Sequence, residues 1–277
     1  MLFCDIPLAA RIERAEARLL ADGAACVARR LGTDRVFSQA VAGGQAAFTE
    51  PDSPLNKVAG LGFDGPVPED ALSAIEEAFA RHGAPARVEL ATLGDPALAA
   101  SLTRRGYVLE GFENVLGLRL PAVDLPSVPD GVRVLPSSAD ELESWLDVTV
   151  TAFLVPDLQG VPSAESFEHD TLRRIVADFV QAEGMTRYLA RRAGAPAGGG
   201  SLRVDSGIAQ LCGAATLPDH RRRGIQTALL SVRLAEAARA GCDLAVVTTQ
   251  PGSKSQENVQ KRGFSLLYSR AILVRTP

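Results

Sequence analysis

The stretch Ala215-Thr-Leu-Pro-Asp-His-Arg-Arg-Arg-Gly-Ile-Gln-Thr-Ala-Leu-Leu230 decides how this chain is interpreted. It leaves an apolar strand, passes through three arginines and Gly224, and opens a long helix. The first N–H groups of a helix lack intrahelical partners, so with the helix dipole they favour a phosphate. Gly224 lets the backbone approach closely. A solvated basic helix start is the alternative, but cations there oppose the dipole and a bound anion explains them better.

The surrounding residues alternate between strand and helix patterns. Strands are predicted at residues 131–135, 186–192, 199–205, 208–217, 244–249 and 264–274, and helices at 138–153, 163–183, 223–240 and 255–262. The three strands between residues 186 and 217 form a predicted antiparallel meander. The glycine-rich residues 193–200 are interpreted as a hairpin turn between two of them.

The first half of the chain repeats this pattern in register. When the sequence is shifted by 157 residues, residues 87–92 lie over 244–249, and Arg104-Arg-Gly-Tyr107 lies over Lys261-Arg-Gly-Phe264. A turn and a helix of equal length separate the two motifs in each copy. Chance similarity between two α/β units is the alternative, but the unbroken register favours an internal duplication. Residues 6–31 are the predicted leading helix of the first copy, and residues 35–49 its hairpin.

The arginine and glycine stretch resembles the acyl-CoA signature of the GNAT superfamily of N-acetyltransferases. That signature, Arg/Gln-x-x-Gly-x-Gly/Ala, is matched by Arg221-Arg-Arg-Gly224-Ile-Gln226, with Gln226 in place of the usual small residue. Residues 255–264, Ser-Gln-Glu-Asn-Val-Gln-Lys-Arg-Gly-Phe, are similar to the family's second CoA-contacting helix. The resemblance covers residues 131–277.

The resemblance and the repeat together imply an α/β (α+β) fold with two GNAT-like domains. Each domain is expected to be a mixed, mostly antiparallel sheet flanked by helices. Residues 1–121 are the predicted degenerate copy, the proline-rich residues 122–130 a linker, and residues 131–277 the acyl-CoA-binding domain.

The resemblance also implies which residues hold acetyl-CoA, the expected co-substrate; no metal is expected. Leu217 would offer backbone groups to the pantetheine arm, and Asn258 its side chain. The helix start would receive the pyrophosphate on main-chain N–H groups. The expected cofactor-binding set is Leu217, Arg221, Arg222, Arg223, Gly224, Ile225, Gln226, Thr227 and Asn258. Either outer phosphates or solvent would contact Lys254, Lys261 and Arg262.

The catalytic groups are less plain in the sequence. Many family members carry a tyrosine acid four residues before the glycine of the Gly-aromatic pair, and Val259 occupies that position. Tyr268 and Asp205 are the candidate catalytic residues, as acid and base, although packing and turn formation also explain them. Further candidates are Glu165, Glu168, His169 and Asp170 as bases, and Ser255 and Cys212 as acids.

The first copy has lost the features that favour phosphate. Where the second copy has Arg221–Gln226, the first has Asp64-Gly-Pro-Val-Pro-Glu69. Two prolines remove N–H donors, and the two carboxylates repel phosphate. Ser101 replaces Asn258. We therefore expect this half to pack against the second, to shape the acceptor pocket or to form a homodimer.

The composition excludes several classes of protein. A net charge of −4 and a pI near 5.5 argue against nucleic-acid binding. No run of 18 apolar residues exists, and the start lacks the features of a signal peptide, so no membrane partner is expected. The four cysteines are scattered without a CxxC pair, which predicts free thiols and a cytoplasmic location.

Two functions remain from this evidence. The first is an acyl-CoA-dependent N-acyltransferase that moves an acetyl group to an amine of a small molecule or peptide, directly in a ternary complex. The second is a non-catalytic acyl-CoA-binding sensor or regulatory module, which the valine at position 259 keeps open. A scaffold with two degenerate halves is disfavoured by the intact arginine and glycine stretch.

Overall fold

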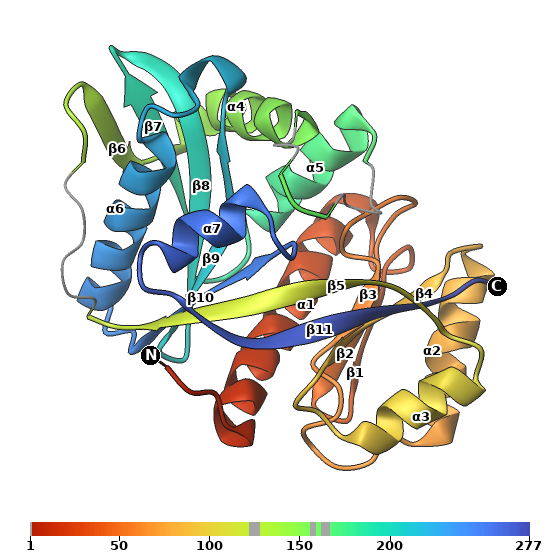
Figure 1. Ribbon diagram of the computed structural model, residues 1–277. Coiled ribbons are helices and arrows are strands. Elements are labelled where there is room, and N and C mark those ends of the chain that lie inside the picture. The colour runs from red at the N-terminus through yellow and green to blue at the C-terminus, as the bar shows by residue number, and fades with distance from the viewer. Residues whose placement is uncertain (1, 122–127, 156–158, 162–166) are drawn as a thin grey trace.

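In the described residues, eleven strands form one continuous sheet that both halves of the chain share. The computed structural model describes residues 2–121, 128–155, 159–161 and 167–277. The strand order is β1-β2-β3-β4-β11-β5-β10-β9-β8-β7-β6, and most neighbours are antiparallel. Each half contributes a mixed, mostly antiparallel sheet with helices, so the predicted fold class is confirmed (Figure 1).

The elements follow one another along the chain in the predicted order. The strands are β1 (Phe37–Val41), β2 (Gly44–Phe48), β3 (Lys57–Ala59), β4 (Ala86–Ala91), β5 (Val108–Arg119), β6 (Val132–Pro136), β7 (Met185–Arg192), β8 (Ala195–Asp205), β9 (Ile208–Thr216), β10 (Leu244–Thr249) and β11 (Ser265–Arg275). The helices are α1 (Ile6–Leu31), α2 (Glu69–Arg81), α3 (Pro96–Arg104), α4 (Leu142–Leu154), α5 (His169–Phe179), α6 (Ile225–Arg239) and α7 (Lys254–Gln260). Short 3-10 turns precede α4 and α6.

The two halves exchange one strand each at the centre of the sheet. β11, from the end of the chain, lies between β4 and β5 of the first half. β5 in turn lies between β11 and β10 of the second half. Each half therefore completes its sheet with a strand from the other, as the crossing of β5 and β11 in Figure 1 shows.

The pairing of β5 with β11 confirms the internal duplication. The register is symmetric, because Ser265 pairs with Gly117 and Val274 pairs with Val108, and the shift of 157 residues exchanges the two pairs. The ladder skips one residue in each strand, Glu110 in β5 and Leu267 in β11. These two residues are also 157 positions apart, so even the irregularities repeat.

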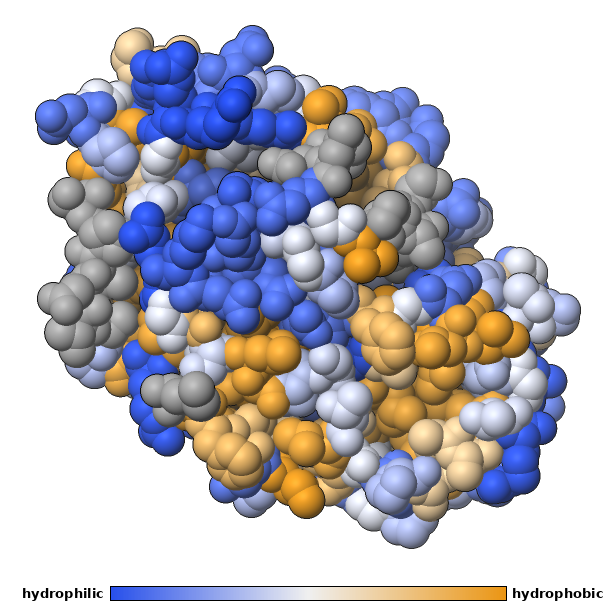
Figure 2. All heavy atoms as spheres, viewed as in Figure 1, coloured by the Kyte–Doolittle hydropathy of each residue, from blue (hydrophilic) through white to orange (hydrophobic). Residues whose placement is uncertain are grey.

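Helices cover both faces of the sheet. α4 and α6 lie on opposite faces, because a Cβ at Gly199 would meet Trp145 and Thr149 of α4, whereas one at Gly198 would meet Ile225 of α6. α1 lies behind the central strands on the α4 face, and α2, α3, α6 and α7 cover the other face (Figure 1). On that second face, hydrophilic side chains gather over α7, and hydrophobic ones lie along and below the central strands (Figure 2).

Local sequence signals explain the ends of the longest helix. Residues 6–31 form α1 as predicted. The Asp5 carboxylate accepts the Leu8 N–H at 2.9 Å, Pro7 fits the first turn, and Gly32 ends the helix with φ of 97°. α1 contacts both halves, since it packs on β2 of the first half and on α5 of the second.

The prediction of a long turn at residues 193–200 was wrong. The turn is confined to Ala193 and Gly194, and β8 begins at Ala195. The glycines belong to the strand because helices press on both of its faces. A Cβ at Gly199 would lie 2.5 Å from Thr149, and one at Gly198 would lie 2.7 Å from Ile225.

Candidate active site

The site begins where two parallel strands separate. β9 and β10 pair over three positions only, from Ile208 with Leu244 to Gln210 with Val246. Beyond these pairs β9 continues to Thr216 and β10 to Thr249, and the strands diverge. Their facing backbone edges in this splayed part are therefore open to a ligand.

The loop at residues 221–224 turns its backbone toward the start of α6. Arg222 has φ of 59° and Gly224 has φ of 78°, both left-handed. Gly224 is the N-cap, and no side chain caps the helix. The first N–H groups of α6 are therefore without an intrahelical or side-chain partner, as in the backbone nests that bind phosphate. Pro129 packs so closely over Gly224 that a Cβ there would lie 2.6 Å from its Cγ.

The three arginines of this loop have different surroundings. The Arg221 guanidinium donates to the backbone carbonyls of Thr216 and Val155 and so ties the loop to β9 and to the end of α4. Arg222 and Arg223 are exposed, and within the described residues neither pairs with a carboxylate. Two cations without a counter-ion beside free N–H groups make this end of α6 suitable for an anion.

The other expected cofactor residues lie around the same helix start. The Leu217 N–H donates to Ala197 O at 3.0 Å and its carbonyl accepts from His220, so both backbone groups are engaged. Ile225 is buried in the core, and the Gln226 side chain is half-buried. Thr227 Oγ1 accepts from Arg262 at 3.3 Å.

The second expected helix presents Asn258 without a partner. Asn258 is half-buried on α7, and no hydrogen bond of its side chain is found in the part of the chain that the structure describes. Lys254 and Lys261 instead pair with Glu257, which lowers the pKa of that carboxyl to about 2. Val259 is buried against α6 in the core, so its position offers no proton donor.

A bulge in β9 faces the splay, and a buried arginine that sequence reasoning missed supports it. β8 and β9 pair at Gly199 with Ala215 and at Ser201 with Cys212. Between these pairs β9 holds two residues, Gly213 and Ala214, opposite the single residue Gly200 of β8. Arg233 of α6 donates from Nη1 to Ser201 O at 2.9 Å and to Cys212 O at 3.4 Å. Burial lowers the pKa of Arg233 to about 10. The sequence signal that could have identified Arg233 is a charged residue in the middle of a predicted helix, between apolar positions that face the core.

The two candidate catalytic residues make structural contacts. The Tyr268 hydroxyl is buried and donates to Glu13 Oε1 of α1 at 2.7 Å. Burial, and then the charge of Glu13, raises the pKa of Tyr268 well above its usual value. Asp205 pairs with Arg18 at 2.7 Å and with Arg203 at 3.3 Å, and its pKa is lowered. Tyr268 is therefore a neutral phenol buried against α1, and Asp205 is a carboxylate whose charge is already balanced by two arginines.

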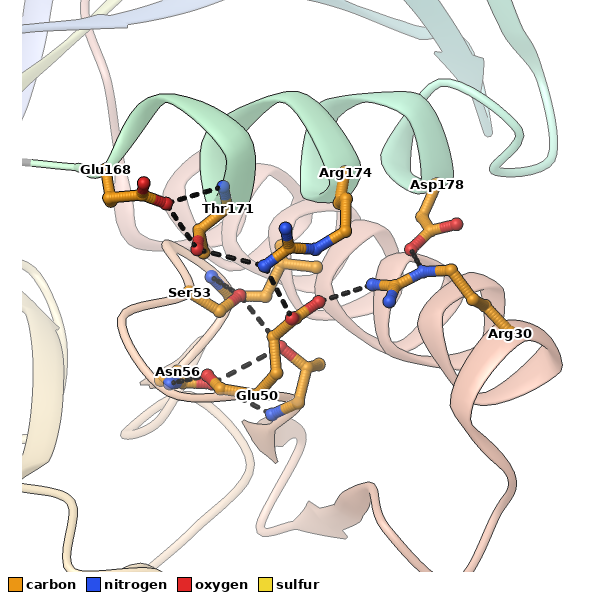
Figure 3. A network of polar contacts seen from close by, with 10 residues as sticks. Arg30, Glu50, Ser53, Asn56, Glu168, Thr171, Arg174 and Asp178 are labelled. Atoms are coloured by element: carbon orange, nitrogen blue, oxygen red, sulfur yellow. Dashed lines mark hydrogen bonds and ion pairs between the residues drawn. The ribbon is translucent and has the colours of Figure 1, made fainter.

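The remaining catalytic candidates are also placed. Glu168 caps α5 through Thr171 (Figure 3). His169 pairs with Asp170 at 2.8 Å. Glu165 lies outside the described residues. Ser255 is exposed, and burial raises the pKa of Cys212 to about 12, so that thiol stays protonated at neutral pH.

A buried cluster of charges on the α1 face was not predicted. Arg270 is 1 % exposed and donates from Nε to Glu13 at 2.8 Å. Its other nitrogens lie 3.7–3.8 Å from Glu16, Glu89 and Glu113. Lys57 binds Glu89 at 2.9 Å and lies 3.4 Å from Glu16. Four carboxylates thus face two cations between α1 and strands β3, β4, β5 and β11.

The cluster lies on the axis that relates the two halves. Glu113 and Arg270 are 157 residues apart in sequence, and they pair directly across β5 and β11. A charged residue at the same position of two apolar strands was the signal in the sequence. Burial, and then the charge of Glu89, raises the pKa of Glu113 to about 7.

Glu113→Gln is expected to stabilise the protein by about 3 kcal/mol at pH 8 and by less than about 1 kcal/mol at pH 5. The folded pKa lies above the usual value of 4.5, so the folded state binds the proton more tightly between pH 4.5 and about 7. That stability is present at low pH and is lost as the pH rises through 7. Urea unfolding at both pH values measures it, with Glu110→Gln on the same strand as control. An equal effect at both pH values would contradict the assignment.

The place equivalent to the α6 start carries negative charge in the first half. Glu69 begins α2, and its carboxylate accepts from Ser101 Oγ at 2.7 Å and from Arg105 Nε at 2.8 Å. Asp64 pairs with Arg14 at 2.5 Å. No side chain caps α2 either, but its first turn carries the carboxylates of Glu69 and Asp70, where the second half has the exposed cations Arg222 and Arg223.

A polar network joins α5 to the first half. Glu50 binds Arg30 of α1 and lies 3.5 Å from Arg174 of α5. Asp178 of α5 binds Arg30 Nε at 2.7 Å (Figure 3). The first half thus fixes the helix that flanks the α4 face of the site.

The comparisons with known proteins agree with this geometry. Residues 147–264 match the family described as Acetyltransferase (GNAT) family. No curated protein matches the chain. Within the described residues, no group of acidic, histidine or cysteine side chains could hold a metal ion, and no helix is long and apolar enough to cross a membrane.

Several solved structures share the fold along most of the chain. A GCN5-related N-acetyltransferase from Kribbella flavida is similar with a TM-score of 0.68 and 22% identity, covering 98% of this chain and 96% of that one. A tandem GNAT protein from the clavulanic acid biosynthesis pathway has a TM-score of 0.61 and 13% identity, covering 90% and 86%. A functionally unknown conserved protein from Staphylococcus epidermidis has a TM-score of 0.56 and 11% identity, covering 75% and 79%.

At these identities the solved structures show the fold, and the family match lies in the half that holds the splay and the helix start. The predicted resemblance is confirmed. Residues 147–264 match the GNAT family of acetyltransferases, and the fold along most of the chain is that of solved GNAT structures.

Proposed function

We propose that the protein is an N-acetyltransferase that uses acetyl-CoA and acetylates an amine of a small molecule or peptide directly, in a ternary complex. One observation carries the proposal: the uncapped start of α6 adjoins the separated ends of β9 and β10. The first feature suits a pyrophosphate, and the second suits an extended arm that ends in a thioester.

The residues divide this task as follows. The main-chain N–H groups at residues 222–227 bind the pyrophosphate, and Arg222 and Arg223 supply positive charge. Asn258 binds the pantetheine arm with its free amide. The supports of the site are Arg221, which ties the loop to β9, and Arg233, which holds the bulge. Free backbone groups of the bulge polarise the thioester carbonyl.

Tyr268 and Asp205 do not transfer protons in this proposal. Each already has a structural partner, Glu13 for the hydroxyl and Arg18 for the carboxylate. The valine at position 259 leaves the departing thiolate without a protein acid there, so water protonates it. We propose that the first half binds no CoA, because the carboxylates of Glu69 and Asp70 in the first turn of α2 repel a phosphate.

Two measurements test the function. Calorimetry with acetyl-CoA tests binding, and free-thiol release tests transfer to a panel of amines: a diamine, an aromatic ethylamine, an amino sugar, an amino acid and a peptide with a free N-terminus. At least one amine is expected to release CoA above the amine-free rate and to yield its N-acetyl product by mass spectrometry. Tight binding of acetyl-CoA without release by any of these amines would support the non-catalytic sensor instead.

A further inference from the structure

Glu113 lies beside the site although it belongs to the first half. β5 is the direct neighbour of β10, and Val115 pairs with Thr248 and Asn114 with Thr249. Thr248 belongs to the splayed end of β10, where the structure leaves it exposed. The strand exchange thus brings β5 next to the open end of the second half.

The Glu113 side chain points to the α1 face of this strand. Val115 packs into the core under α1, so Glu113, two residues away, shares that face, as its ion pair with Arg270 requires. On β10, Leu244 and Val246 also face α1, and Thr248 continues that row. The exposed Thr248 pairs with Val115, and Glu113 is two residues further along β5. Two residues along a strand span about 7 Å, so Glu113 is offset from Thr248 by about that distance in the strand direction.

The surroundings of Glu113 favour a cation. The charged groups that face it come from α1, β3, β4 and β11; they are Glu13, Glu16, Lys57, Glu89 and Arg270. Together with Glu113, this cluster holds four carboxylates and two cations. Glu113 is the most open carboxylate of the four, with 25% of its side chain exposed.

We propose that Glu113 is the base that accepts the proton of the incoming amine, and that the acceptor is a basic amine which arrives as an ammonium ion. This rests on the proposed function. A surplus of negative charge on the α1 face attracts the ammonium. A carboxyl held near pH 7 by burial and by Glu89 both accepts and returns a proton at neutral pH.

The proton balance of the reaction is complete with this residue. The ammonium gives one proton to the Glu113 carboxylate, and the neutral amine attacks the thioester carbonyl carbon. The C–N bond forms, the C–S bond breaks, and the thiolate leaves and takes a proton from water. The nitrogen loses its second proton, as the amide forms, to the hydroxide that this water leaves. In sum two protons leave the ammonium, one matches that taken by the thiolate, and one is released to solvent when Glu113 returns to its carboxylate.

The test measures kcat/KM from pH 5.5 to 9.5 with acetyl-CoA and the panel amine that wild type acetylates fastest. Wild type is expected to lose activity below pH 7. Glu113→Gln is expected to lower kcat/KM about 100-fold at pH 7.5, to lack the limb near pH 7, and to regain rate as the amine itself deprotonates. Its affinity for acetyl-CoA is expected to be unchanged.

Two matched variants separate a base from a structural residue. Glu110→Gln removes a carboxylate from the same strand, 40% exposed and paired with Arg87, and should keep the wild-type profile. Glu89→Gln removes a charge that raises the pKa of Glu113, so the limb should move to lower pH without disappearing. If Glu113 had only a structural role, Glu113→Gln would not remove the activity loss below pH 7, and Glu89→Gln would not move it to lower pH.

The outcomes are distinct. If wild type acetylates an amine and Glu113→Gln keeps both its rate and the limb near pH 7, the inference is overturned and the proposed function stands. If wild type acetylates no amine of the panel, the proposed function fails and the inference fails with it. Loss of the limb in Glu113→Gln together with its shift in Glu89→Gln supports the inference.

Discussion

Replacing Gly224 by alanine is expected to weaken acetyl-CoA binding about 100-fold, a loss of about 2.7 kcal/mol. Gly224 has φ of 78°, and an added Cβ would lie 2.6 Å from Pro129. The loop must therefore shift, and the N–H groups at the start of α6 lose their common direction. Calorimetric titration with acetyl-CoA measures the effect.

Gly241→Ala is the matched control for this substitution. Gly241 follows the other end of α6 with φ of 79°, and no atom lies within 4 Å of an added Cβ. The two variants carry the same backbone strain, about 1 kcal/mol. Only the change at Gly224 should affect binding. Equal affinities in both variants would refute the assignment of this loop to acetyl-CoA.

Replacing Arg270 by methionine is expected to destabilise the protein by about 3–5 kcal/mol at pH 7. The guanidinium is 1 % exposed and is the one group of the cluster that contacts all four carboxylates. Its removal leaves Lys57 to balance them. Urea unfolding at pH 7 and pH 5 measures the loss, which should shrink at pH 5 because carboxylates then take up protons.

Arg239→Met is the control for the removal of an arginine. Arg239 forms a surface pair with Glu236 on α6, and its side chain is 68% exposed, so a change below about 0.5 kcal/mol is expected. If Arg270→Met fails to fold, Arg270→Lys keeps one charge and should lose a smaller, measurable part of the stability. A loss below 1 kcal/mol in Arg270→Met would mean that the cluster is balanced without it.

Local elements were predictable because short-range signals specify them. α1 was predicted as the leading helix of the first copy, and its cap, proline and terminal glycine explain its ends. α6 and α7 were predicted from the patterns around Gly224 and Asn258. The duplication was predictable because an unbroken offset aligns two motifs in each half. The acyl-CoA site remains a prediction, carried by the uncapped start of α6.

The strand exchange was not predictable in the same way. Both β5 and β11 read as final strands of their own copies, and nothing local tells a strand which copy it joins. The charge cluster follows from that exchange, because it brings Glu113 beside Arg270 over 157 residues of sequence. Sequence reasoning chose Tyr268 and Asp205 by position along the second half, and contacts with α1 of the first half engage both.

The exchange of strands also determines the order in which the protein is completed during synthesis. The first half emerges from the ribosome well before the second, at a rate of roughly 5–20 residues per second. Its sheet cannot close then, because the strand between β4 and β5 is β11, which follows α7 in the second half. Until that strand arrives, the edges of β4 and β5 stay unpaired and open to other chains. The nascent protein therefore depends on the eleven residues of β11 before either half is finished.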